Sequence, residues 1–411
     1  MAMKKILVLG TLDTKGEQLD YLRERIKHRG HQVILMDVSM GAGSTVEADV
    51  TPGEIVQLVG KNIEELRSLK DRFVITEAMT SGAQQMALKL YSEGKVDGIV
   101  ALGGATMALM GARAMQMLPF GIPKVIAVPA AMPVYVHQWF EATDIVIMQV
   151  IMEIAGMNDL VKHAIEQTAG TISGMAEESR SIPSLKLPFP SIAITEIGFS
   201  VKCARQVEKL LEEKGYNVCS FHAQGISDRA MDRLISEGFF DGIIDIVPAG
   251  LLEEVIKGNR AAGMERLDAT AERGIPQVLT PCCLNLTGCG PTRKEGEKYN
   301  SRPKIWKMDA MRSMTRLNGE ELQMCAKLYA EKLNKTKGPV KFFIPLKGWS
   351  AIDGEGTILY DPGEDHIFID ELRKHLKSEV ELVEVDNNLE DFEFAQALVE
   401  SFDKMFRAAK K

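Results

Sequence analysis

Residues 5–16 read KILVLGTLDTKG, and this stretch decides the fold. The apolar run Ile6–Leu9 ends at Gly10, a polar loop follows at once, and Glu17 opens a helical pattern. A strand that passes through a polar loop into a helix is typical of open α/β sheets, which place ligands at that junction. The loop offers hydroxyls, backbone N–H groups and one ammonium near a helix N-terminus, which favours an anion such as phosphate. It lacks the spacing of a Walker loop and of the Gly-x-Gly-x-x-Gly fingerprint.

The composition is that of a globular protein with more than one domain. The chain has 411 residues, 45% of them hydrophobic and 26% charged, and this length exceeds one ordinary core. The net charge of −8 argues against nucleic acid or an anionic membrane as the main partner. Six cysteines without a C-x-x-C pair, and an N-terminus without a signal-peptide pattern, predict a cytoplasmic location.

Predicted strands and helices alternate along the first half of the chain. This order indicates a mostly parallel sheet covered on both faces, in a doubly wound arrangement. The strands are expected at 5–10, 33–38, 97–102 and 123–129, and the helices at 16–30, 55–69, 81–93 and 106–118.

The pattern then repeats. Residues 191–222 align with residues 6–37 at a constant offset of 185 and without a gap, and two further stretches match in the same order. We therefore predict two similar α/β domains, at 1–180 and 190–411, joined by a proline-containing linker near 177–190. Within the second domain, residues 284–318 have weak periodicity and are predicted to form a basic loop, with eight Lys or Arg against three acidic residues between Arg293 and Arg316.

Three strand-to-loop junctions of the first domain are expected at the same edge of its sheet. Each alone is more often a tight turn or a helix cap, but together they favour a site for a nucleotide or another phosphorylated small molecule. The predicted binding residues are Gly10, Thr11, Asp13, Thr14 and Lys15 after the first strand, Asp37 after the second, and Gly103, Gly104, Ala105, Thr106 and Met107 after the third.

Three side chains of this set have specific expected roles. Lys15 lies in a first helical turn, which is unfavourable for a cation unless an anion is near. Asp37 is expected to accept hydrogen bonds from ribose hydroxyls, or to cap the loop. Asp13 is expected to hold Mg²⁺ together with phosphate, or to cap its own helix.

The second domain lacks these residues at its matching positions, so the scaffold does not need them in order to fold. Glu196, His222 and Cys283 lie instead at its predicted strand ends. They form a candidate acid–base or nucleophilic set for an enzyme that acts in an interdomain cleft, as a lyase, hydrolase or transferase. A lone histidine at a strand end is more often structural.

Several segments resemble the uncharacterised bacterial family related to the ATP-binding N-terminal region of the tomato mosaic virus resistance protein. They include GTLDTKGEQLDYLRERIKHRGHQVILMDV at 10–38, EGKVDGIVALGG at 93–104 and KFFIPLKGWSAID at 341–353. The resemblance implies two Rossmann-like domains, ATP with Mg²⁺ in the first of them, and a homodimer or larger homo-oligomer. A purely structural interaction module is the third interpretation that the sequence leaves open.

Overall fold

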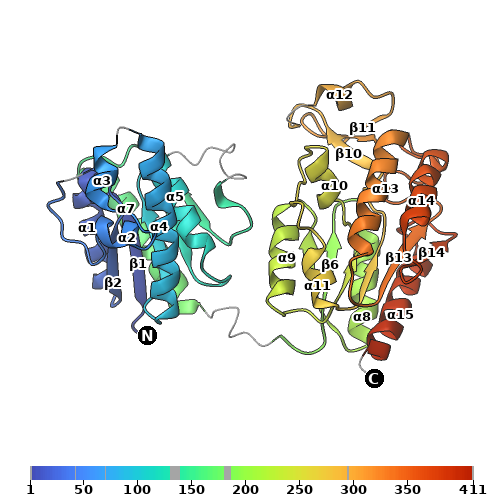
Figure 1. The fold of residues 1–411 in the computed structure, drawn as a ribbon, viewed down its shortest axis with the longest axis horizontal. Coiled ribbons are helices and arrows are strands. Elements are labelled where there is room, and N and C mark those ends of the chain that lie inside the picture. The colour runs from blue at the N-terminus through green and yellow to red at the C-terminus, as the bar shows by residue number, and fades with distance from the viewer. Residues whose placement is uncertain are drawn as a thin grey trace. The chain divides into compact units, whose positions relative to one another are not determined.

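The chain forms two compact units, Met1–Lys186 and Leu187–Lys411. The computed structural model describes residues 2–41, 43–69, 71–129, 139–179, 187–293 and 296–409, so residues 180–186 of the expected linker lie outside the described ranges. Each unit has a parallel sheet with helices on both faces, which confirms the predicted α/β class (Figure 1). No helix in the described part of the chain is both long and apolar enough to cross a membrane.

The sheet of the first unit has the strand order β2-β1-β3-β4-β5, and all its pairs are parallel. Side chains of the central strand alternate between its two faces: Leu7 and Leu9 pack on one side, Ile6 and Val8 on the other, and all four are fully buried. The strands are β1 (Lys5–Gly10), β2 (Gln32–Asp37), β3 (Gly98–Leu102), β4 (Lys124–Val128) and β5 (Val146–Gln149).

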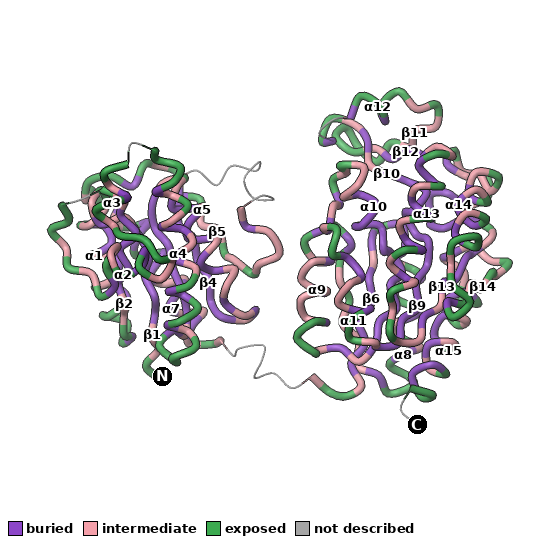
Figure 2. Tube along the Cα trace, in the orientation of Figure 1, coloured by how far each residue is buried: buried purple, intermediate pink, exposed green. Residues whose placement is uncertain are grey.

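Helices cover both faces of this sheet, and their exposed outer turns are green in Figure 2. One core layer joins the sheet to the first and last helices of the unit, and a second layer joins it to the helices in between. The helices are α1 (Leu12–His28), α2 (Pro52–Gln57), α3 (Ile63–Ser68), α4 (Arg72–Ser92), α5 (Ala105–Gln116) and α7 (Asp159–Glu178).

The single helix predicted at 55–69 was wrong, because two helices occupy this stretch. α2 begins in a capping box of Thr51 and Glu54 and is followed by Gly60 at φ 69°. Asn62 then caps α3 by accepting hydrogen bonds from the N–H groups of Glu64 and Glu65. The local capping signals therefore override the continuous apolar periodicity.

The second unit has a larger parallel sheet with the order β14-β13-β9-β8-β6-β7. Its strands are β6 (Ser191–Glu196), β7 (Asn217–His222), β8 (Gly242–Asp245), β9 (Gln277–Leu279), β13 (Val340–Pro345) and β14 (Glu381–Val385). Its helices are α8 (Val201–Glu213), α9 (Ile226–Ser236), α10 (Gly250–Val255), α11 (Asp268–Arg273), α12 (Glu297–Asn300), α13 (Gly319–Leu333), α14 (Pro362–His375) and α15 (Phe392–Ala409).

The basic loop predicted at 284–318 contains a small antiparallel sheet, so the prediction of a loop was wrong there. β10 (Leu286–Cys289), β11 (Ile305–Lys307) and β12 (Ser313–Arg316) pair in the order β10-β12-β11. These strands of three or four residues are too short to show an alternating pattern. The sheet is attached to the unit partly by Trp306, whose ring packs edge-on against Phe199 at a centroid distance of 5.7 Å.

The internal repeat is visible in the two sheets, with one shift of register. Gly10 is the partner of Asp37 in the first unit, whereas Glu196 is the partner of His222 in the second. The gap-free alignment had matched Gly10 to Thr195. The strand β6 is therefore displaced by one residue relative to that alignment, and Glu196 takes the position of Gly10.

Candidate functional site

A pocket of about 520 Å³ lies at the carboxyl edge of the first sheet. It collects the segments that follow β1, β2 and β3, as expected for an open α/β sheet. Its lining residues are Thr11, Asp13, Thr14, Lys15, Met40, Gly41, Arg72, Ile75, Gly104, Ala105, Thr106 and Met107. Eight of the predicted binding residues are among them.

The N-terminus of α1 is already occupied by groups of the protein. The N–H of Leu12 donates to Asp37 Oδ1 at 3.1 Å, and the N–H of Asp13 donates to Ser39 Oγ at 3.0 Å. The N–H of Lys15 donates to the carbonyl of Thr11 at 2.9 Å. The first turn of this helix therefore has few donors left for a ligand, and its contribution to the pocket is made by side chains.

The N-terminus of α5, in contrast, has N–H groups without partners among the residues that the structure describes. Among the described residues no side chain caps it, and the first N–H to bond within the helix is that of Ala108, which donates to the carbonyl of Gly104 at 3.0 Å. The N–H groups of Ala105, Thr106 and Met107 have no partner in the described part of the chain. Three free donors at the positive end of a helix are chemically suited to an anion.

Two cations line the pocket. Lys15 Nζ donates to the carbonyl of Ile154 at 2.6 Å and lies 3.4 Å from Glu153 Oε1. The Glu153 side chain is 65% exposed, so this ion pair is weak and an incoming anion can replace it. The second cation is the exposed side chain of Arg72, at the first position of α4.

Asp13 contributes a carboxylate with one oxygen unused. Its Oδ2 accepts from the N–H of Gly41 at 3.0 Å, whereas its Oδ1 is buried and has no hydrogen-bond partner among the described residues. The predicted capping of its own helix is not observed, because Asp37 and Thr11 supply the acceptors there. An unpaired carboxylate oxygen beside an anion pocket is chemically suited to a cation such as Mg²⁺.

Three predicted binding residues do not line the pocket, and each has a structural role. A Cβ on Gly10 would lie 2.3 Å from Leu19 Cδ1, and a Cβ on Gly103 would lie 2.7 Å from Met107 Cβ. These glycines allow close packing of helix on strand. Asp37 is 6% exposed, and its Oδ1 accepts hydrogen bonds from Leu12 and from Ser39, which matches the capping alternative. Its binding to ribose stays a prediction.

The sequence reasoning missed Arg72, Met40, Gly41 and Ile75 as lining residues. Asp71 followed by Arg72 is a helix-start signal, since the Asp71 carboxylate caps α4. That signal could have located the beginning of α4. It could not have shown that this beginning faces the loop of residues 11–15, because the contact is set by tertiary packing.

In the second unit, Glu196 and His222 are partners at the ends of β6 and β7. The exposed His222 lines a separate pocket of about 280 Å³, which Glu196 does not line. The lining residues that the structure describes for this pocket all come from the second unit. The strand ends thus bring two of the three candidate catalytic residues together, and their role in catalysis stays a prediction.

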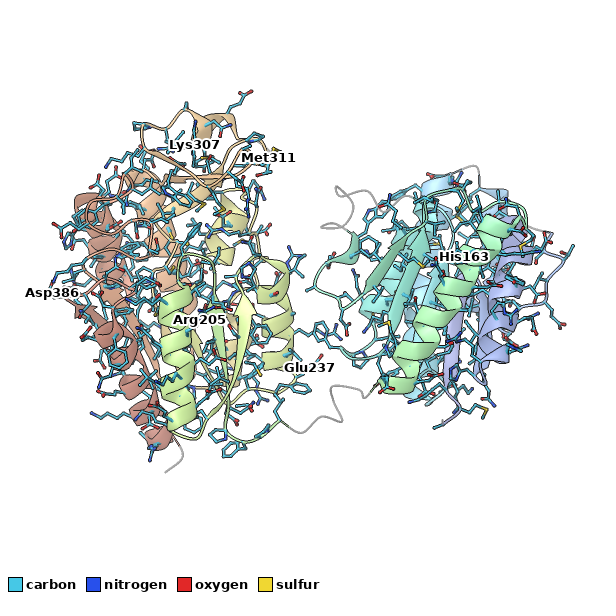
Figure 3. All side chains as sticks on the ribbon, turned by 180° about the vertical axis from the view of Figure 1, so that it is seen from behind. His163, Arg205, Glu237, Lys307, Met311 and Asp386 are labelled. Atoms are coloured by element: carbon cyan, nitrogen blue, oxygen red, sulfur yellow. The ribbon has the colours of Figure 1, made fainter. Side chains whose placement is uncertain are left out.

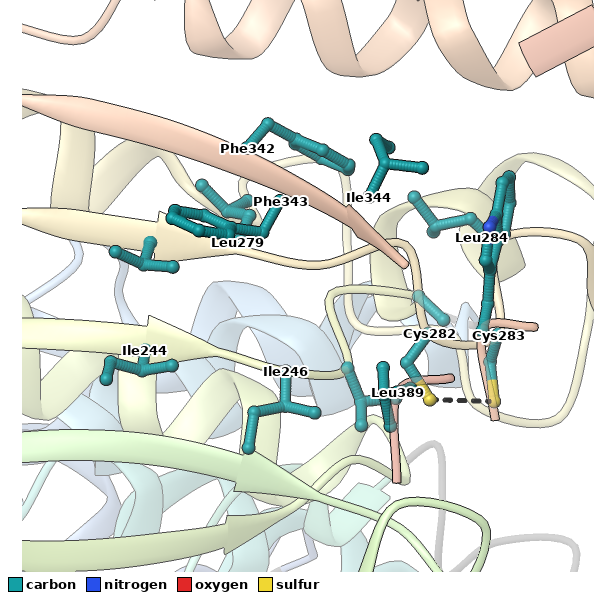
Figure 4. Packing of buried hydrophobic residues seen from close by; sticks show 14 of the residues in the cluster. Ile244, Ile246, Leu279, Cys282, Cys283, Leu284, Phe342, Phe343, Ile344 and Leu389 are labelled. Atoms are coloured by element: carbon teal, nitrogen blue, oxygen red, sulfur yellow. Dashed lines mark hydrogen bonds between the residues drawn. The ribbon is translucent and has the colours of Figure 1, made fainter. Parts of the chain in front are cut away.

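The third candidate, Cys283, is fully buried and is not a lining residue of that pocket. Its sulfur lies 3.8 Å from the sulfur of Cys282, and Figure 4 shows both thiols beyond the ends of the neighbouring strands. Cys283 has φ 61°, an uncommon conformation for a residue with a side chain. A hydrogen bond from Cys282, helped by the nearby Arg260 guanidinium, lowers the pKa of the Cys283 thiol against the opposing effect of burial.

Solved structures with a detectable likeness include UDP-GlcNAc 2-epimerase of Methanocaldococcus jannaschii and a putative UDP-N-acetylglucosamine 2-epimerase of Listeria monocytogenes. The first has 9% identity and a TM-score of 0.25, and covers 67% of this chain and 83% of its own. The second has 8% identity and a TM-score of 0.23, and covers 68% of this chain and 79% of its own. Such scores are too low to bear on function.

Sequence relatives match over both units. A UPF0261 protein of Clostridium tetani is 34% identical over 403 residues, covering 98% of this chain and 99% of its own. The ToMV resistance protein Tm-1(GCR237) of Solanum lycopersicum is 28% identical over 419 residues, which cover 97% of this chain but 55% of the tomato protein. Residues 4–181 match the N-terminal domain of the uncharacterised protein family UPF0261, and residues 189–406 match its C-terminal domain. The chain therefore belongs to the UPF0261 family, which confirms the resemblance noted from its opening segment.

Proposed function

We propose that the first unit binds a nucleotide through its phosphates, with ATP as the leading ligand. The observation that carries this proposal is the vacant N-terminus of α5, which faces the same pocket as the hydroxyl groups of Thr11 and Thr14. Backbone donors at a helix start are well suited to phosphate oxygens, because they combine directed N–H groups with the positive end of the helix dipole.

The charges around the pocket support an anionic ligand. Lys15 and Arg72 are cationic and Asp13 is the one acidic residue among the lining residues. The Lys15 ammonium can turn from the exposed Glu153 to a phosphate at little cost. The cavity volume of about 520 Å³ lies within the range of about 300–1,000 Å³ that is usual for small-molecule sites.

The residues present also fit Mg²⁺. Asp13 Oδ1, which is buried without a hydrogen-bond partner, is the oxygen that would hold the ion together with phosphate oxygens and water. Among the described residues no group of three or more His, Cys, Asp or Glu is arranged to hold a metal ion, so phosphate is needed to complete the ligand set. Bound Mg²⁺ would neutralise part of the phosphate charge, while Asp13 stays oriented by the N–H of Gly41.

Calorimetric titration of the full chain tests the proposal. We expect ATP with Mg²⁺ to bind, inorganic tripolyphosphate to bind more weakly, and adenosine to bind least, because the identified contacts are to phosphate. Chelation of Mg²⁺ should weaken ATP binding, and Asp13→Asn should remove this dependence on Mg²⁺. If neither ATP nor tripolyphosphate binds, the pocket is not a phosphate site and the proposal is rejected.

A further inference from the structure

The pocket of about 280 Å³ in the second unit has a lining unlike that of the nucleotide pocket. It lies between the segments that follow β6 and β7 and the small antiparallel sheet, whose β11–β12 turn carries Met311, labelled with Lys307 in Figure 3. Its volume is below the range of about 300–1,000 Å³ that holds drug-sized ligands. A compact molecule therefore matches this pocket better than a nucleotide does.

One wall of this pocket contains the guanidinium group of Arg260, which is 5% exposed. Its Nη2 donates to Glu253 Oε1 at 2.8 Å and to the carbonyl of Leu286 at 3.3 Å. Its Nη1 is buried and donates to no oxygen or nitrogen among the described residues, although the thiol of Cys283 lies near the guanidinium. Because a buried cationic donor without an acceptor is destabilising, this atom is suited to an anionic oxygen from a ligand.

The buried charges behind this wall do not balance. Arg260 and Arg293 are both 5% exposed, and the carboxylate between them is that of Glu253, 1% exposed. Arg293 donates to Thr287 Oγ1 at 2.5 Å and to two backbone carbonyls, and these acceptors are neutral. Although burial opposes it, Arg260 holds the pKa of Glu253 below its ordinary value, so the carboxylate is ionised. The group carries one net positive charge, which favours a single negative charge nearby.

The pocket also has an apolar part. Ile197, Phe199 and Met314 line it and are all less than one-tenth exposed. Two glycines of the lining, Gly198 and Gly288, leave open space, since a Cβ on either would meet no heavy atom within 4 Å. The lining thus combines this apolar surface with the Glu253 carboxylate and two guanidinium groups, that of the buried Arg260 and that of the exposed Arg312, which is paired with Asp309.

We propose that the second unit binds a small monocarboxylic acid with a short apolar body, its carboxylate paired with Arg260 and its body packed against Ile197, Phe199 and Met314. One negative charge balances the buried arginine pair, and the apolar wall disfavours ligands that are polar throughout. This site is additional to the nucleotide pocket and shares no residue with it.

Cys283 is the competing source of negative charge. Its thiol has a lowered pKa because of the Cys282 hydrogen bond and the nearby Arg260. If Cys283 were a thiolate, it would balance the arginine pair and leave no role for an acid in the pocket. The protein would then show thiolate ultraviolet absorbance at neutral pH that Cys283→Ser removes, and carboxylates would not bind.

Benzoate and 4-methylpentanoate are suitable probes, with benzamide and 4-methylpentanamide as neutral counterparts and inorganic phosphate as an anion without an apolar body. In calorimetric titration of the full chain, we expect each acid to bind at least ten-fold more tightly than its amide, because the amide lacks the charge that Arg260 requires. Phosphate should not compete with the acids. Equal binding of acid and amide, or displacement of the acids by phosphate, would overturn the proposal.

Gly198→Leu provides the structural test, because a Cβ at this lining position would meet no heavy atom within 4 Å. We expect it to abolish acid binding while the melting temperature and the ATP titration are unchanged. Gly363→Leu is the matched control, since Gly363 lies outside the pocket and its Cβ would meet only Asp361 Oδ1 at 3.5 Å. Binding that survives Gly198→Leu would place the acid elsewhere and refute the site. Arg260→Lys keeps the positive charge but removes the planar guanidinium with its several N–H donors, and it should weaken the binding of both acids at least ten-fold.

Discussion

Replacement of Gly104 by Asp should make the protein more stable and at the same time unable to bind nucleotide. Gly104 is the N-cap of α5, with φ −90° and ψ −163°, and a Cβ there would meet no heavy atom within 4 Å. An aspartate can therefore be accommodated without strain. Its carboxylate would accept hydrogen bonds from the free N–H groups of Thr106 or Met107. The Asp71 carboxylate caps the start of α4 in the same way.

The two effects have different sizes. Capping and the helix dipole together should add about 1 kcal/mol, which raises the melting temperature of a unit of this size by about 2–4 °C. A carboxylate about 4 Å from a phosphate charge costs about 4 kcal/mol at the effective dielectric constant of a protein surface, or roughly a thousand-fold in affinity. ATP at about 100 times its Kd stabilises the wild-type chain by about 2.7 kcal/mol, and this gain should vanish in the variant.

Differential scanning calorimetry with and without ATP and Mg²⁺ measures both effects in one series. Gly104→Asn is the control, because it adds the cap without the charge and should lose much less affinity than Gly104→Asp. Gly174→Ala, on α7, is a second control at another glycine whose Cβ would meet nothing within 4 Å. If Gly104→Asp retains the full ATP-induced shift, phosphate does not sit at α5 and the reasoning fails.

Three further outcomes are expected. Lys15→Ala should weaken ATP binding at least ten-fold in calorimetric titration. The control Lys27→Ala removes the ion pair between Lys27 and Glu24 and should leave ATP binding unchanged. Equal effects of the two substitutions would contradict a role for Lys15 in the pocket. Arg72→Ala should reduce the salt dependence of ATP affinity, and Lys89→Ala on the same helix should leave it unchanged; a wild-type salt slope in Arg72→Ala would exclude its guanidinium from the site. Burial raises the pKa of Asp232 to about 7 although Arg266 opposes it, so the folded chain holds a proton that the unfolded chain releases above about pH 4. Stability to urea should therefore fall as pH rises from about 4 to about 7, by at most about 1.4 kcal/mol per pH unit, and Asp232→Asn should flatten this slope.

The sequence sufficed to predict the alternating elements and the edge of the sheet at which polar residues gather. Apolar runs that end in glycine mark the ends of the strands at 5–10 and 97–102. Parallel strands place these ends at one edge of the sheet, which predicts that the loop at 11–15 and the start of α5 share a pocket. The split of the 55–69 helix also has local signals, at Gly60 and Asn62, but the apolar periodicity continues across them and hides the break.

Other features depend on contacts between distant segments. The antiparallel sheet within 284–318 is made of strands too short to show a pattern, and its pairing becomes apparent only in the folded chain. The burial of Asp37 against Leu12 and the approach of Arg72 to the pocket are likewise consequences of packing. No spacing in the sequence distinguishes a carboxylate that caps a helix from one that binds a ligand.

Each of the two pockets takes all its described lining residues from one unit. A substitution that damages one pocket therefore removes no contact from the other, and natural selection can adjust the two specificities separately. Duplication of a shared scaffold followed by independent drift at its strand ends accounts for Gly10 in one half where Glu196 stands in the other. The border near residue 187 thus also separates two halves of a single gene product that can diverge from their shared scaffold in different directions.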